Sequence, residues 1–579
     1  MGCKNYPLYL KQFRELFLSA VKTFYKEGVI SLVKKAAEYL LPRKYKYSPP
    51  CYSAEVNIKI QNLEYKPFFT IIIVLEDIKN LTKIITSIKN QWYKHYEIIL
   101  IEDSVNSNYN YNTLNNELNI KSITLEPAFD LKRRILKEAN GEFILFMNSE
   151  CLLSPDLLYK ITLSLNKSKS QVLYFDEDVV DTKGNYNLPF FKPDYSYHLL
   201  LSFNYFGICF CVDKDLFNKI DCLGDYNGYN LLYDISLQCI ENTKRIDHIP
   251  EVLFHNLQQR KLNTDSKSVE VVNDHLKRKR ILAKVEFDNS LGCNDVIYSL
   301  PEPKPFISLI ILTKDKLNYL RRFIKSIITK STYPNYEIII VDNRSEKKET
   351  IEWLNKAQKL YDNLKIVKAD FQFNWSKLNN KGIKAAQGDV LIFLNNDMEV
   401  ISNDWMERMA GDALQPEVGT VGALLLYKDY TIQHAGAVVG LIGWCNHLYR
   451  FSKVNKKKHR PFVSPLYKRN ILASTGACLC VSRKVIEDIG MFDERYCITD
   501  GDIEFSLRAF DRGYINVYNP YVRLFHYEGK SRSNNVLQTD LDYAKKVYIK
   551  YLENGDPYYN KNLSLYTPEP KIKLFSLKT

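Results

Sequence analysis

The feature that most constrains this chain of 579 residues is a long internal repeat. Three blocks occur twice in the same order: KPF at 66–68 and 304–306, ANGE at 139–142 with AQGD at 386–389, and GICFCV at 207–212 with GACLCV at 476–481. The offsets between the copies are 238, 247 and 269 residues, so each copy is long enough to form a whole domain. We therefore expect one fold written twice, with about 22 extra residues late in the second copy.

Within each copy, short β-branched runs alternate with helical stretches. The runs TIIIVL and YEIILI of the first copy correspond to SLIIL and YEIIIV of the second, with a helical pattern between the members of each pair. This alternation predicts an α/β fold in two tandem domains, each with a parallel-type mixed sheet flanked by helices. We expect the following boundaries: a basic helical segment at 1–65, the first copy at 66–260, a charged and partly helical linker at 261–302, the second copy at 303–540 and a tail at 541–579.

The formal net charge of +13 is concentrated in two segments. Residues 1–49 hold ten Lys and Arg against three Glu, and residues 452–470 hold seven Lys and Arg with no acid, which leaves the remaining chain close to neutral. A nucleic-acid binder usually spreads its charge along one surface. We therefore expect no nucleic-acid partner, and instead an anionic membrane surface or a phosphate-bearing substrate.

The N-terminal segment has apolar residues at helical spacing with lysines between them. Two interpretations stay open: a helix pair docked on the next domain, or an interfacial helix on anionic lipid. No apolar run is long enough to span a bilayer, and charges interrupt any candidate secretory signal. Twelve cysteines without a C-x-x-C pair indicate reduced thiols. The sequence therefore favours a cytoplasmic protein, peripheral at the inner face of the cytoplasmic membrane if the helix binds lipid.

Polar side chains follow three predicted strands of the second copy. They are Thr313 and Asp315 after the first strand, Asp342 after the second, and Asn395 and Asp397 after the third. One such residue is usually a turn former or a helix cap. Three polar strand ends in one domain indicate a binding site, because parallel α/β sheets bind ligands beyond the carboxyl ends of their strands.

Long stretches of the second copy carry a family resemblance. They include IIVDNRS, FNWSKLNNKGIKAAQGDVLIFLNNDMEVISNDWMERM, EVGTVGALLLYKDYTIQHAGAVVG, STGACLCVSRKVIEDIGMFDERY, GDIEFSLRAFDRGY and NPYVRLFHYEGKSR. Together they cover nearly all of residues 305–535, which resemble a family 2 glycosyltransferase with the GT-A fold, of the kind that assembles bacterial O-antigen, capsule and cell-wall polysaccharide. The first copy resembles the same family more weakly, over residues 66–256.

The resemblance implies a nucleotide-sugar donor whose diphosphate needs Mg²⁺ or Mn²⁺, cations that prefer oxygen ligands. The acidic metal motif of the family falls on 395–397, where Asp397 supplies the carboxylate, and the late-strand histidine of the family falls on His526. The donor site implied by the resemblance comprises Thr313, Asp315, Asp342, Asn380, Gly382 and Asn395, with Asp342 at the base or ribose and the N-x-G pair before the diphosphate.

Inverting transfer needs a base for the acceptor hydroxyl, and a carboxylate is the expected group. The family places it in an acidic pair ahead of an arginine, which matches Asp502, Glu504 and Arg508. Asp502 is therefore the expected base, although Gly501 departs from the Glu or Asn found before it in many relatives. The extra residues add Trp444, His447 and the basic cluster, which we expect near the acceptor, a glycan or lipid-linked glycan; a solvated basic loop is the alternative. Glu504 and Arg508 are expected on the same acceptor side, where they shape the site and pair with each other.

The first copy lacks the same groups. Leu232 stands where Asp502 would, Gln238 where Arg508 would, and Glu102 where Asp342 would. Because leucine cannot accept a proton, we expect this copy to be catalytically silent. The alternatives are a bifunctional enzyme with two active copies, a non-catalytic glycan-binding or assembly scaffold, and a sugar nucleotidyltransferase, which is disfavoured because no Gly-rich, basic triphosphate loop is evident.

Overall fold

The computed structural model describes residues 45–103, 120–125, 130–258, 267–454, 460–527 and 537–573. The chain divides into two compact units. The N-terminal unit comprises residues 45–299 together with 455–470, and the described part of the C-terminal unit comprises 300–454 and 471–573. Within the described ranges, no helix combines the length and apolar character needed to cross a membrane.

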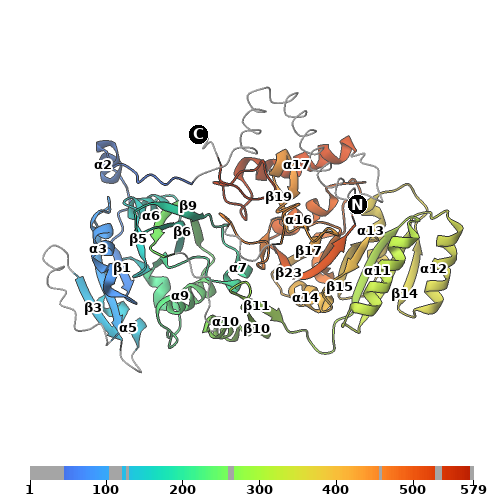
Figure 1. Cartoon of the computed structure of the whole chain (residues 1–579), viewed down its shortest axis with the longest axis horizontal. Helices are drawn as coiled ribbons and strands as arrows, with labels where there is room; N and C mark the ends of the chain where they lie inside the picture. The colour runs from blue at the N-terminus through green and yellow to red at the C-terminus, as the bar shows by residue number, and fades with distance from the viewer. Residues whose placement is uncertain are drawn as a thin grey trace, which may run out of the picture. The chain divides into compact units, whose positions relative to one another are not determined.

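The N-terminal unit is built on one large mixed sheet with helices on its faces (Figure 1). Its strands are β1 (Phe69–Val74), β2 (Tyr96–Asp103), β3 (Ile120–Leu125), β4 (Phe143–Asn148), β5 (Cys151–Leu153), β6 (Val172–Val180), β7 (Tyr186–Phe190), β8 (Cys209–Asp213) and β9 (Ile246–Asn256), with a separate hairpin of β10 (Ala283–Asp288) and β11 (Cys293–Tyr298). Its helices are α2 (Ala54–Gln61), η1 (Ile78–Asn80), α3 (Leu81–Lys89), α5 (Leu131–Glu138), α6 (Leu157–Leu165), α7 (Tyr197–Ser202), α8 (Lys214–Lys219), α9 (Gly228–Asn242) and α10 (Lys267–Arg278).

The C-terminal unit repeats this architecture. Its strands are β12 (Ile307–Thr313), β13 (Tyr336–Asp342), β14 (Leu364–Lys368), β15 (Val390–Asn395), β16 (Met398–Val400), β17 (Val418–Leu426), β18 (Ile432–His434), β19 (Ala437–Val439), β20 (Cys445–His447), β22 (Cys478–Ser482) and β23 (Ile515–His526), while β21 (Arg469–Ile471) lies at the unit boundary. Its helices are α11 (Leu317–Lys330), α12 (Lys348–Leu360), α13 (Trp375–Ala385), α14 (Trp405–Ala413), η2 (Leu441–Gly443), α15 (Arg483–Ile489), α16 (Gly501–Asp511) and α17 (Gln538–Asn554).

The two large sheets have matching strand orders. The order is β3-β2-β1-β4-β8-β6-β9-β5 in the N-terminal unit and β14-β13-β12-β15-β22-β17-β23-β16 in the C-terminal unit. In the second sheet β12 pairs in parallel with β13 and β15, whereas β22 is antiparallel to β15. The predicted tandem α/β fold, with a mixed sheet of parallel type in each copy, is therefore confirmed.

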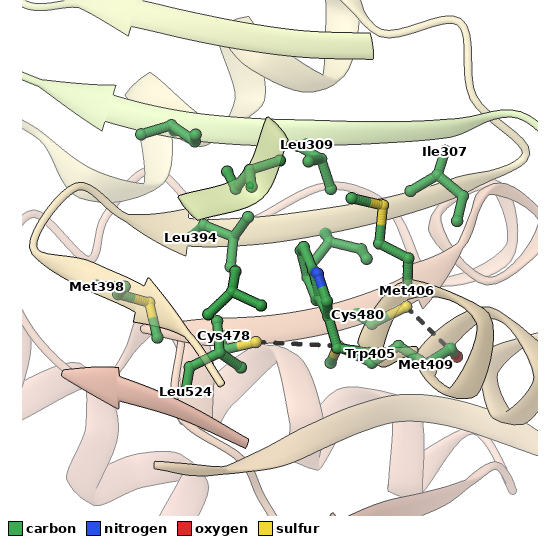
Figure 2. Close-up of a cluster of buried hydrophobic side chains, with 14 of the residues drawn as sticks. Ile307, Leu309, Leu394, Met398, Trp405, Met406, Met409, Cys478, Cys480 and Leu524 are labelled. Atoms are coloured by element: carbon green, nitrogen blue, oxygen red, sulfur yellow. Dashed lines mark hydrogen bonds between the residues drawn. The ribbon is translucent and has the colours of Figure 1, made fainter. Parts of the chain in front are cut away.

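Side-chain alternation along the strands builds a core on each face of the C-terminal sheet. Leu309 of β12 belongs to the cluster covered by α11, α12 and α14, and its neighbour Ile310 to the cluster covered by α13, α15 and α16, as expected where successive side chains point to opposite faces. Figure 2 shows Trp405 and Met409 of α14 packed against the first of these faces, with the thiol of Cys480 donating to the Met409 carbonyl at 3.7 Å.

Both copies of the repeat also contain the same buried polar network, which lies at the starts of neighbouring strands. In the C-terminal unit the Ser308 hydroxyl donates to Glu337 at 2.8 Å and accepts from the Gly388 amide at 2.8 Å. A Cβ at Gly388 would lie 2.6 Å from the Ser308 nitrogen, so this close approach requires glycine. The equivalent bonds of the N-terminal unit join Thr70, Glu97 and Gly141. This network explains why the ANGE and AQGD blocks retain their glycine.

Two regions differ from the sequence expectation, and a third lies outside the described residues. The region expected as a linker contains α10 and the β10–β11 hairpin, because Val271, Val272 and Leu276 form a buried helical face. The region expected as a tail packs through α17, whose Ala544 and Tyr548 enter a hydrophobic cluster. The predicted helical segment at the N-terminus lies outside the described residues as far as residue 44.

The basic segment at 452–470 also differs from the expectation of a loop at the acceptor side or in solvent. Residues 455–459 lie outside the described ranges, and 460–470 belong to the N-terminal unit. Lys468 is buried there, donates to the Val296 carbonyl at 3.0 Å and lies over the Tyr298 ring. Asn470 accepts from the His198 amide at 3.0 Å. These hydrogen bonds within the N-terminal unit replace the water molecules that the buried polar groups would otherwise need.

Candidate functional site

A cleft of about 620 Å³ opens at the carboxyl ends of β12, β13 and β15. Of the predicted donor-site residues, Thr313, Asp315 and Asn395 line it. The other lining residues are outside the predicted donor set: Leu312, Lys314, Lys316, Asn343, Lys347, Phe373, Leu378, Asn396 and Ile498. Three lysines in one wall give the cleft positive character, which suits an anionic ligand such as a diphosphate. The sequence signal that could have identified these lysines is their position directly after a strand or directly before a helix.

Asp315 holds the mouth of this cleft in shape. Its carboxylate accepts a hydrogen bond from the backbone N–H of Lys347 at 2.9 Å, and its own N–H donates to the Ser345 hydroxyl at 2.9 Å. Asp315 and Lys316 both have left-handed backbone, with φ of 53° and 57°. Such conformations cost of order 1 kcal/mol or more each and cluster at functional sites. Asp315 therefore fixes the two loops that carry the cleft lysines.

Asp342 ends β13 and is largely buried, with its carboxylate accepting from the Ser345 N–H at 3.2 Å. Its neighbour Asn343 lines the cleft and donates to the carbonyls of Ala369 and Phe371 at 3.1 and 2.8 Å. Asp342 itself is not among the lining residues. Its contact with a nucleotide stays a prediction.

Asp397 and His526 meet because of strand register. β16 pairs antiparallel with β23, so that Met398 lies opposite His526 and the preceding Asp397 lies beside the imidazole, with Oδ1 at 3.3 Å from Nε2. The Asn395 amide nitrogen is 3.2 Å from the same Nε2. Asp397 is 2% and His526 5% exposed. His526 is thus brought next to Asn395, a cleft residue that lies 131 positions away in the chain.

This pair fits a divalent cation in part. A carboxylate and an imidazole lie side by side, and the buried Nδ1 of His526 has no hydrogen-bond partner among the described residues. Within those residues, no cluster of three or more His, Cys, Asp or Glu could hold a metal. Mg²⁺ is commonly held by one or two protein ligands together with substrate phosphates and water. The donor set therefore fits a cation that shares its coordination with a diphosphate.

Asp502 lies in the first turn of α16, and its side chain is partly exposed. Its Oδ2 accepts a hydrogen bond from the Gly476 N–H at 2.6 Å. The next residue, Ala477, accepts from the N–H of Asn395 at 3.0 Å. The Asp502 carboxylate is therefore bonded to Gly476, and the next residue, Ala477, is bonded to Asn395, which lines the cleft.

Two glycines allow this close packing. A Cβ at Gly476 would overlap the Trp375 ring and lie 3.1 Å from the Cβ of Asp502, and a Cβ at Gly501 would lie 2.8 Å from the Ser376 hydroxyl. The departure at Gly501 thus has a local cause, because a larger side chain there has no room beside the start of α13.

Four of the predicted residues make structural contacts instead of lining the cleft. Asn380 exchanges hydrogen bonds with the backbone of Phe492 at 2.8 and 3.0 Å. Gly382 lets α13 approach β12, since a Cβ would lie 2.5 Å from Ile310 Cγ2. Glu504 and Arg508 form a bidentate pair with both N–O distances at 2.9 Å.

The extra residues of the second copy lie near the start of α16. The indole N–H of Trp444 donates to Asp500 at 3.1 Å, and its ring lies 5.2 Å from that of Tyr548. His447 Nδ1 is 2.7 Å from Nδ1 of His434, one nitrogen donating to the other. Asp500 was missed from the sequence, because an Asp before a helix resembles an ordinary cap.

The corresponding positions of the N-terminal unit are filled differently. Leu232 is buried within α9, and a Cβ at Gly228, where α9 begins, would overlap the Glu76 carboxylate. His255 pairs with Asp178 at 2.6 Å, and the Tyr47 ring lies 4.4 Å from its imidazole. The imidazole of His255, the counterpart of His526, is therefore already in contact with the side chains of Asp178 and Tyr47.

Comparison with known proteins identifies the family. The model described as "Glycosyl transferase family 2" matches residues 70–220 and 308–489. The chain is 30% identical over 532 residues to the O-antigen biosynthesis protein RfbC of Myxococcus xanthus, covering 87% of this chain and 41% of the relative. It is 27% identical over 536 residues to the uncharacterized protein y4gI of Sinorhizobium fredii (strain NBRC 101917 / NGR234), covering 87% and 58%. The chain thus spans about half the length of these relatives.

Solved structures with lower similarity include GalNAc-T7 with UDP, GalNAc and Mn²⁺ (TM-score 0.35, 18% identity, 43% of this chain and 50% of that chain). Staphylococcus aureus TarS gives a TM-score of 0.31 at 15% identity, covering 43% of this chain and 40% of that chain. Because the family model matches both copies and more than half of the residues, the chain belongs to glycosyl transferase family 2.

Proposed function

We propose that this chain transfers a sugar from a nucleotide-sugar donor to a growing surface polysaccharide or lipid-linked glycan, with inversion at the anomeric carbon. The observation that carries the proposal is the position of Asp502, whose carboxylate is held on the Gly476 amide, next to Ala477, which is bonded to the cleft residue Asn395. Family membership supports the reaction class. The O-antigen name of one relative supports the acceptor class.

In the proposed reaction the donor diphosphate lies in the cleft near Lys314, Lys316 and Lys347, whose charges offset those of the phosphates. Asp397 and His526 would hold a divalent cation, which would stabilise negative charge on the diphosphate. Asp342 is the proposed nucleotide contact. The role of Asp315 is to keep the lysine loops in place.

Asp502 is the proposed general base. It accepts the proton of an acceptor hydroxyl while the hydroxyl oxygen attacks the anomeric carbon. The bond from that carbon to the diphosphate oxygen breaks, and a nucleoside diphosphate leaves with the electron pair. A base of this kind contributes about 10²–10⁴ in rate.

The N-terminal unit is proposed to be catalytically silent. Its counterpart of Asp502 is the buried Leu232, and Glu76 fills the space at the start of α9. We propose that the unit instead holds residues 460–470 through buried contacts such as that of Lys468 with Val296. The reaction is proposed for the cytoplasmic face of the membrane, where a lipid-linked acceptor would be met.

The test is a screen of UDP-, GDP- and dTDP-sugars with the purified chain, with and without Mn²⁺, following release of nucleoside diphosphate and products by mass spectrometry. The proposal expects turnover of at least one donor by the wild type and its loss in Asp502→Asn. Transfer from a second donor that survives in Asp502→Asn would show an active first copy. Absence of turnover with every donor would reject the proposed function.

A further inference from the structure

Asp500 is a buried carboxylate that the proposed reaction does not use. It is 6% exposed and precedes α16 by one residue, two positions before Asp502. Its backbone is left-handed, with φ of 65°, a conformation that Asp and Asn tolerate better than most residues. A charged group in such a place is costly unless hydrogen bonds compensate for the lost water. Its partners therefore indicate what the residue does.

Two side chains from other elements converge on one oxygen of Asp500. The Tyr548 hydroxyl of α17 donates to Oδ1 at 2.6 Å, and the Trp444 indole N–H donates to the same atom at 3.1 Å. Tyr548 and Trp444 are also in ring contact, with centroids 5.2 Å apart. One carboxylate oxygen thus ties α17 and the segment before β20 to the start of α16.

The charges of Asp500 and Asp502 act on each other at the start of α16. Burial raises the pKa of the Asp500 carboxyl above its ordinary value, and the charge of Asp502 raises it further. Burial and the charges of Asp500 and Asp502 raise the pKa of the Cys445 thiol. The two carboxylates are therefore close enough to repel each other, and the start of α16 must be held against that repulsion.

We propose that Asp500 is a positioning residue for Asp502: the hydrogen bonds from Tyr548 and Trp444 fix the first turn of α16, so that the Asp502 carboxylate stays on the Gly476 amide. The inference deepens the proposed function and rests on it for the catalytic role of Asp502. It assigns a task to Trp444 and to the C-terminal helix, which neither the repeat nor the family match explains.

The alternative to this positioning role is that the Tyr548 hydrogen bond only packs α17 against the rest of the C-terminal unit. The chain provides a matched control for that alternative. Tyr551, one turn further along α17, donates to Asp511 at the other end of α16 at 2.6 Å. Tyr548→Phe and Tyr551→Phe each remove one hydroxyl bond between the same two helices. They differ in which end of α16 is released.

The experiment measures amide hydrogen exchange of Gly476 by NMR, together with kcat and the donor KM. We expect Tyr548→Phe and Trp444→Phe to speed exchange of Gly476 about tenfold, equivalent to about 1.4 kcal/mol, and to lower kcat with the donor KM unchanged. Tyr551→Phe should leave exchange and kcat at the wild-type values. Asp500→Asn, which keeps an Oδ1 acceptor for both donors, should retain the protection of Gly476.

Equal effects of Tyr548→Phe and Tyr551→Phe would overturn the inference, as would unchanged Gly476 exchange in Tyr548→Phe. Loss of protection in Asp500→Asn would also overturn it, because both hydrogen bonds can still form. The exchange measurement needs no substrate. If the wild type turned over no donor, the proposed function would fail, while the exchange rates would still decide whether Asp500 holds Asp502 in place.

Discussion

Replacing Asp502 by Asn tests the proposed chemistry with little change of shape. The carboxylate accepts one hydrogen bond from the Gly476 N–H at 2.6 Å and another from the Ile503 N–H at 3.0 Å, and the amide oxygen of Asn can keep the first of these. The substitution removes the proton acceptor and one of two neighbouring negative charges. The cleft lysines and the Asp397–His526 pair are left as they are.

The expected magnitudes for activity and stability differ clearly. Loss of a general base lowers kcat by about 10²–10⁴, or about 2.7–5.4 kcal/mol at roughly 1.36 kcal/mol per factor of ten. A charge-assisted hydrogen bond of about 1.5–3 kcal/mol becomes a neutral one of about 0.5–1.5 kcal/mol, a loss of roughly 1 kcal/mol. Relief of repulsion with Asp500 offsets part of that loss. The Ile503 N–H loses its acceptor in the variant, which costs about 1 kcal/mol more. Activity should therefore collapse while the free energy of unfolding falls by about 2 kcal/mol or less.

The assay follows release of nucleoside diphosphate from whichever donor the wild type turns over, alongside urea unfolding and calorimetric donor affinity. Asp511→Asn is the control, because Asp511 lies on the same helix and accepts from Tyr551 at the far end. It should keep wild-type turnover. A kcat for Asp502→Asn within tenfold of the wild type would refute the assignment of the base, as would an equal loss in Asp511→Asn.

Four further predictions follow from single contacts. Gly476→Ala should lower the free energy of unfolding by about 1–3 kcal/mol in urea, because the added Cβ overlaps the Trp375 ring; an unchanged midpoint contradicts this packing. Asp500→Asn should gain stability over the wild type as pH rises above 3.8, since a raised folded-state pKa favours the neutral acid and costs stability once it ionises; a pH-independent difference between the two unfolding curves counts against it. Asp397→Asn should raise the Mn²⁺ concentration needed for calorimetric binding of UDP, GDP or dTDP, and unchanged metal dependence argues against a ligand there. Glu150 of the first copy stands where the second copy has Asp397; Glu150→Gln should leave donor turnover unchanged, and a loss would show that the first copy takes part.

The sequence predicted the edge of the sheet on which the cleft lies. Thr313, Asp315 and Asn395 were found because they directly follow buried strands, and that placement depends on local pattern alone. The cleft lysines were missed because a lysine in a loop is ordinarily a solvated charge. Asn380 was expected at the donor, but its side chain is used by the backbone of Phe492. A motif position does not reveal which of its neighbours will take its hydrogen bonds.

By itself, the sequence determined the doubled α/β fold, because strand and helix periodicity and the repeated blocks can be recognised in short segments. It also determined that Asp502 has no counterpart in the first copy, where leucine stands. The tertiary structure alone decided that residues 460–470 belong to the N-terminal unit and that α17 reaches Asp500. These contacts join residues far apart in the chain, and which of them form depends on how whole elements pack to bury apolar surface and pair polar groups.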